Sequence, residues 1–99
     1  MRSTYRAKIY WLTAQEGGRK EMPKGDKYAP IINVIKPLFE SVDYWSVFVV
    51  NIDFLSENET ISEIRYLSEM APDNLDKNVE FELREGNKMV ASGIVLDKL

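Results

Sequence analysis

The chain of 99 residues contains no cysteine and no histidine. Without cysteine it can form neither disulfide bonds nor thiolate metal sites. Without histidine it lacks the most common general base near neutral pH, the usual partner of a nucleophilic serine and the most common zinc ligand. Any catalysis would have to use carboxylates, lysine or tyrosine, and none of these forms a recognisable catalytic pattern. We therefore expect a non-enzymatic protein with no metal ion or cofactor.

Long apolar runs are also absent. The most apolar stretch, residues 45–55, is too short and too interrupted to span a bilayer. The N-terminus has neither the apolar segment nor the cleavage site of a signal peptide. The expectation is a cytoplasmic protein without a membrane partner. The composition, 44% hydrophobic and 29% charged, is that of an ordinary folded protein, and residues 1–99 suffice for one domain only.

The net charge of −3 is unevenly distributed. Residues 1–37 carry eight basic and three acidic side chains, whereas residues 38–99 carry five basic and thirteen acidic ones. Such a bipolar chain can attract a polyanion to its basic part or can associate with itself, and most often it simply keeps the surface solvated.

Most of the chain shows the period-two alternation of β-strands. We expect strands over residues 4–12, 28–35, 45–55, 78–84 and 89–96. In the third of these, the pattern places Phe48 and Phe54 in the core, together with Trp11 and Phe81 of other strands. Trp45 has the opposite parity, which suits either a surface anchor for a partner or a residue packed at the end of the core.

Three local features refine this outline. Gly86-Asn87 between two alternating segments predicts a two-residue type II′ hairpin with a positive φ at Gly86. Gly93 inside a strand predicts a β-bulge or a close backbone approach. Residues 60–70 fit a helix with a Thr60–Glu63 capping box as well as a strand, although the short strands around them favour a strand. Residues 71–78 should form a loop, with one helical turn possible at 73–76.

The segment AQEGGRKEMPKGDKYAP, residues 14–30, is rich in glycine and basic residues. It is not followed by a helix and lacks the Lys-Ser/Thr ending, so it does not match a nucleotide-binding loop. The pattern instead indicates a long connection whose glycines, Gly17 and Gly18, adopt positive φ angles.

Three motifs resemble the C-terminal β-barrel domain of elongation factor Tu. AKIYWLTAQEGGRK resembles the family's first strand and Glu-Gly-Gly-Arg loop, Tyr28-Ala29-Pro30 stands where the family has Tyr-x-Pro, and FELREGNKMVASGIV resembles its closing hairpin. The resemblance spans residues 5–96. It implies an all-β fold, a six-stranded antiparallel β-barrel of the translation-factor C-terminal type, with residues 62–68 as a strand. No GTP-binding motif is present, so GTP hydrolysis is not implied.

The resemblance also implies a contact surface, because this barrel of the family binds other proteins and the backbone of aminoacyl-tRNA. The corresponding residues here belong to the loop, to Tyr-x-Pro and to the hairpin: Gly17, Gly18, Arg19, Lys20, Tyr28, Pro30, Gly86 and Lys88. The sequence differs from the family at Lys20, Ala29, Asn87 and Lys88, which replace histidine, arginine, glycine and arginine. We expect a stand-alone binding module with a protein partner, related to translation or mimicking the translation factor.

The alternative is an RNA- or tRNA-backbone-binding protein that uses the basic N-terminal third, with no DNA partner expected. Arg6 and Lys8 alternate with Tyr10 on the outer face of the first strand, and four more basic residues follow in the loop. The pI of about 5.0 runs against the basic character usual for such proteins.

Overall fold

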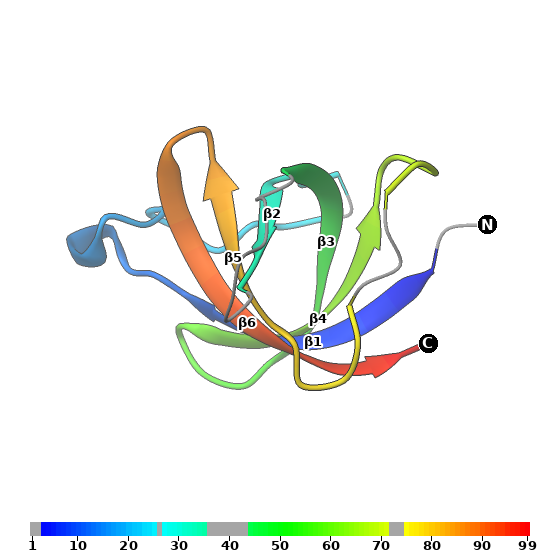
Figure 1. Ribbon diagram of the computed structural model, residues 1–99. Helices are drawn as coiled ribbons and strands as arrows, with labels where there is room; N and C mark the ends of the chain where they lie inside the picture. The colour runs from blue at the N-terminus through cyan, green and yellow to red at the C-terminus, as the bar shows by residue number, and fades with distance from the viewer. Residues whose placement is uncertain (1–2, 26, 36–43, 72–74) are drawn as a thin grey trace.

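The protein is a closed six-stranded β-barrel (Figure 1). A computed structural model describes residues 3–25, 27–35, 44–71 and 75–99. The elements in chain order are β1 (Thr4–Trp11), the 3₁₀ helix η1 (Ala14–Glu16), β2 (Ile31–Val34), β3 (Trp45–Phe54), β4 (Glu59–Tyr66), β5 (Glu80–Glu85) and β6 (Lys88–Lys98). The strands are arranged in the order β1-β4-β3-β2-β5-β6, and every pair is antiparallel. Because β1 pairs with both β4 and β6, the sheet closes, which confirms the predicted fold class.

The ambiguous segment at residues 60–70 is a strand as far as Tyr66. It forms β4 between β1 and β3, and its side chains alternate, with Ile64 and Tyr66 buried and Arg65 exposed. Thr60 does not cap a helix. Its hydroxyl instead accepts a hydrogen bond of 2.9 Å from the indole N–H of Trp11. The alternation of period two, favoured by the surrounding strands, was therefore the better guide than the capping pattern.

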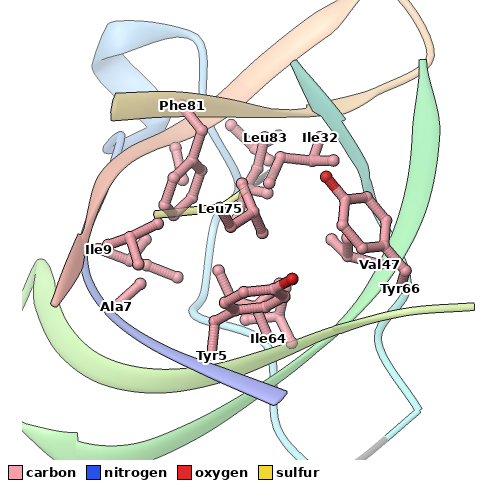
Figure 2. Close-up of a cluster of buried hydrophobic side chains, with 14 of the residues drawn as sticks. Tyr5, Ala7, Ile9, Ile32, Val47, Ile64, Tyr66, Leu75, Phe81 and Leu83 are labelled. Carbon is pink, nitrogen blue, oxygen red and sulfur yellow. The ribbon is translucent and has the colours of Figure 1, made fainter. Parts of the chain in front are cut away.

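The core fills the inside of the barrel with side chains from every strand (Figure 2). Four alternate residues of β1 are buried as predicted, namely Tyr5, Ala7, Ile9 and Trp11. Leu75 lies in the middle of this cluster although it belongs to a connection. The sequence predicts a loop at residues 71–78 and gives no sign that Leu75 is buried. The helical turn predicted as possible at 73–76 lies partly outside the described residues.

The prediction for the inner face of β3 was wrong. Val47 and Val49 are buried, whereas Phe48 is only partly buried and Phe54 is 62% exposed. Trp45 shares the inward parity and packs against the core, which agrees with the second of its two interpretations. The error has a physical source: residues 47–50 are all apolar, so alternation of polarity cannot reveal which face points inward.

A polar cluster replaces the apolar core at one end of the barrel. Asn51, next in the inward series of β3, accepts hydrogen bonds from Ser62 (2.7 Å) and Thr60 (3.2 Å), both fully buried. The Asn51 amide donates to the carbonyl oxygen of Pro23 at 3.1 Å, which ties the long β1–β2 connection to the barrel. The β3–β4 register then shifts between Asn51 and Asp53, as in a β-bulge.

Gly93 of β6 marks a close approach between side chain and backbone. A Cβ atom at this position would lie 2.5 Å from Cζ of Phe81 and 2.9 Å from the carbonyl oxygen of Lys8. The aromatic ring therefore occupies the space that a side chain would need. This is the second of the two outcomes predicted for a glycine inside a strand.

Three connections meet at one end of the barrel, because β1, β3 and β5 all run toward it. They are residues 12–30, 55–58 and 86–87, and we call them the loop end. β1 begins and β6 ends on the other side of the barrel (Figure 1), where the Leu99 amide donates to the Thr4 carbonyl oxygen at 2.8 Å. Within the part of the chain that the structure describes, no helix is long and apolar enough to cross a membrane.

Candidate functional site

The glycine-rich segment is a tight, hydrogen-bonded turn. Thr13 and Glu16 form a capping box around η1, in which the Glu16 amide donates to the Thr13 hydroxyl at 3.2 Å and the Thr13 amide to Glu16 Oε1 at 2.9 Å. Gly17 ends the helix with φ 91°, as predicted. The prediction of a positive φ was wrong for Gly18, which is needed for a different reason: a Cβ there would lie 2.1 Å from the Leu12 carbonyl oxygen.

The turn directs Arg19 toward two residues that are distant in the sequence. Its guanidinium forms an ion pair of 2.5 Å with Glu85 at the end of β5. The same guanidinium lies over the ring of Tyr28, 4.8 Å from the ring centroid, and the Tyr28 hydroxyl donates to the same Glu85 oxygen. We call these three residues the Arg19–Tyr28–Glu85 brace. It joins the long connection to the closing hairpin.

The brace keeps its charges in place. Burial alone would raise the pKa of Glu85, but hydrogen bonds from Tyr28 and Arg19 outweigh this and hold the pKa below its ordinary value. Burial, together with the hydrogen bond to Glu85, raises the pKa of Tyr28 far above its ordinary range. The bond to Glu85 also raises the pKa of Arg19. At neutral pH the brace is therefore an ionised pair with a protonated tyrosine, and it holds no free base.

Tyr28 and Pro30 tie the end of the long connection to β3. The Tyr28 carbonyl oxygen accepts from the Val49 amide and the Pro30 carbonyl oxygen from the Val47 amide, both at 3.0 Å. The predicted strand at 28–35 thus begins later, at Ile31, while the residues before it still follow β3. The Tyr28 ring also packs on Trp11, with ring centroids 5.9 Å apart.

The remaining predicted residues surround the brace. Gly86 has φ 62° and forms the predicted two-residue turn with Asn87, which does not have a positive φ. Lys88, on the far side of this turn, is exposed and close enough to lower the pKa of Glu85. Lys20 is exposed beside Arg19. All eight predicted residues therefore belong to the loop end or to the start of the strand that leaves it.

Two parts of this surface were missed in the sequence. Glu85 was not selected, because nothing local shows that Arg19, 66 positions earlier, faces it. The exposed end of β3 and the start of the connection after it were missed, because the sequence pattern assigns Phe54 to the core. Phe54 and Leu55 are 62% and 52% exposed. A cavity of about 120 Å³ separates this connection from the long connection and is lined by Trp11, Arg19, Lys20, Met22, Glu57 and Asn58, among others.

In the part of the chain that the structure describes, no three acidic side chains are grouped so as to hold a metal ion. Residues 12–30, 55–58 and 85–88 together carry five basic and five acidic side chains, so the loop end has no net charge. It offers exposed apolar side chains, scattered charges and a braced backbone. No model of a known protein family matches the chain.

Proposed function

We propose that the chain is a binding module that holds a protein partner at its loop end. The observation that carries this proposal is the Arg19–Tyr28–Glu85 brace. It fixes two of the three connections relative to each other through an ion pair, a hydrogen bond and a cation–π contact. A surface fixed before binding loses less conformational entropy on association, which favours affinity.

The apolar tip at Phe54 and Leu55 supports a protein partner. Exposed aromatic and large aliphatic side chains on a braced scaffold are typical of residues that anchor protein interfaces. Phe54 ends β3 and Leu55 begins the next connection, whose residues Glu57 and Asn58 line the small cavity together with Arg19. The contact surface would thus comprise the loop residues Arg19 and Lys20, the hairpin residue Lys88, and this apolar tip.

The charge distribution favours a protein over RNA. The positive charge of Arg19 is already paired with Glu85, and the basic side chains of the loop end are balanced by acidic ones. Polyanion binding depends mainly on uncompensated cations that can neutralise phosphates. RNA-backbone binding through Lys20 and Lys88 is the second candidate, since both are exposed and neither is ion-paired with another described residue.

We further propose kinship with the C-terminal barrel of elongation factor Tu, and a cytoplasmic role close to translation. Two observations support this. The closed six-stranded barrel is the architecture that the resemblance implied. In addition, its three motifs, which are separate in the sequence, contribute Arg19, Tyr28 and Glu85 to one brace.

A capture experiment with paired variants tests the protein partner. The domain, tethered through its C-terminus, is exposed to cytoplasm of the source cell, and captured proteins are identified by mass spectrometry. We expect Phe54→Asp/Leu55→Asp to reduce capture of the specific partner by about tenfold or more. Met70→Asp, which changes an 83% exposed residue outside the loop end, should leave capture unchanged. Equal losses in both variants would contradict the assigned surface.

Retention on bulk tRNA at low salt tests the second candidate. If RNA is the ligand, Lys20→Glu/Lys88→Glu should abolish retention and rising salt should weaken it steeply. A wild-type domain that shows no retention at low salt would eliminate RNA binding and leave the protein proposal intact.

A further inference from the structure

The outer wall formed by β3 and β4 carries a pattern that the loop end does not use. On β3, Phe48 and Val50 point outward and are only partly buried, and Ile52, at the β-bulge, is 46% exposed. On β4, Arg65 pairs in register with Phe48, and Glu63 pairs with Val50. We call these five residues the β3–β4 face. An apolar row thus runs beside a row that contains one positive and one negative charge.

Local contacts hold the face in a fixed form. The Arg65 guanidinium lies over the Phe48 ring, 5.4 Å from its centroid. Neither Glu63 nor Arg65 forms an ion pair with another described residue. A shallow hollow of about 180 Å³ lies among Phe48, Val50, Glu63 and Arg65. The face therefore offers a recess next to apolar side chains, and one charge of each sign is available to a partner.

We propose that two copies of the chain associate through their β3–β4 faces about a twofold axis. The axis lies in the interface plane, perpendicular to the strands, midway between the Phe48–Arg65 pair and the Val50–Glu63 pair, so that the strand direction is reversed in the second copy. Arg65 of each copy then faces Glu63 of the other, and Phe48 faces Val50 beside the hollow. A twofold interface requires this kind of self-complementarity, because each residue must find its counterpart in an identical surface.

The closed sheet favours this mode over strand exchange. Every strand of the barrel has a neighbour on both sides, so β4 can meet another chain only through its side chains. A standard interface buries about 800 Å² of each partner, which is about an eighth of the accessible surface of 6348 Å². The β3–β4 face shares no residue with the loop end, so this association leaves the loop end free.

Charge reversal with complementation tests the arrangement. Sedimentation equilibrium is measured on the wild type, on Arg65→Glu, on Glu63→Arg, and on an equimolar mixture of the two variants. We expect each single variant to dimerise roughly tenfold more weakly or worse, because like charges face each other. The mixture and the double variant Glu63→Arg/Arg65→Glu should recover dimerisation, because opposite charges face each other again.

Two controls make each outcome decisive. Lys77→Glu changes an exposed charge next to Asn78, whose amide donates to Val95 of β6, and should dimerise like the wild type. Val50→Thr keeps the side-chain shape and should weaken the dimer even if a charge variant fails to fold. A wild-type chain that stays monomeric at millimolar concentration would overturn the proposal. Dimerisation that survives Arg65→Glu and Val50→Thr unchanged would place the interface elsewhere.

Discussion

Individual side chains at the loop end take their roles from partners that are far away in the sequence. The loop sequence alone is enough to identify Arg19 as a candidate contact residue. In the structure its charge is paired with Glu85, and its guanidinium packs on the ring of Tyr28. The structure therefore adds a structural role to Arg19, which the sequence predicts only as a contact residue: its side chain ties the long connection to the closing hairpin. Lys20 and Lys88 remain as exposed cations near it.

The brace should give the stability of the protein a defined pH dependence. The pKa of Glu85 is lowered from 4.5 in the folded state, so its contribution is present above pH 4.5 and is lost as pH falls through the folded value. The pKa of Tyr28 is raised from 10.0, so its contribution is present below pH 10.0 and is lost at higher pH. The benefit of the brace should therefore be constant between these limits.

Urea denaturation of the wild type, Glu85→Gln and Tyr28→Phe at several pH values measures this effect. At neutral pH we expect each variant to unfold about 1 kcal/mol more easily, a value reduced by the partial exposure of the pair. The difference between the wild type and Glu85→Gln should shrink toward acid pH. A difference that stays the same at pH 3 would show that the Glu85 charge does not stabilise the fold.

At the scale of single strands and turns, some sequence patterns predict the structure without knowledge of tertiary contacts and others do not. The closing hairpin and β1 were predicted accurately, because Gly-Asn encodes a turn and β1 alternates between apolar and charged residues. The inner face of β3 was mistaken, because its apolar residues point both ways and only the cross-strand bonds of Asn51 fix the parity. Tertiary contacts, which no single segment contains, decide such cases.

The turn at Gly17-Gly18 gives a prediction at this scale. Gly17→Ala should cost about 1 kcal/mol of unfolding free energy, because the left-handed φ strains a Cβ that otherwise has open space. Gly18→Ala should cost about 3 kcal/mol, because its Cβ would overlap the backbone of Leu12. Gly17→Asn is the matched control, since asparagine tolerates this φ. Equal costs for the two alanine variants would mean that the turn relaxes away from Leu12.

At the scale of the whole molecule, neighbouring strands of the barrel pair over very different numbers of residues. β1 pairs with β4 over seven residue pairs, whereas β2 and β3 share only Ile31–Ser46 and Ile32–Trp45. Further along this edge of β3, the amides of Val47 and Val49 donate to the carbonyl oxygens of Pro30 and Tyr28, which belong to the long connection and not to β2. The β2–β3 boundary should therefore open before the rest of the sheet.

Native-state hydrogen exchange checks this order. We expect the amides of Val47 and Val49, which donate to Pro30 and Tyr28, to exchange at least about tenfold faster than the amide of Ile9 at the centre of β1. Exchange of all three amides at one rate would indicate that the barrel opens only by global unfolding.

The hydrogen bond from the Leu99 amide to the Thr4 carbonyl oxygen also bears on how the domain can be tagged, immobilised or fused. Both ends of the described chain leave the barrel within one strand pair, on the side away from the loop end (Figure 1). A tag, a surface or a second domain joined there is therefore kept away from the braced connections. A short linker between the two ends would also permit new termini to be opened elsewhere, so the barrel is suited to circular permutation and to insertion as a cassette into a loop of a host protein.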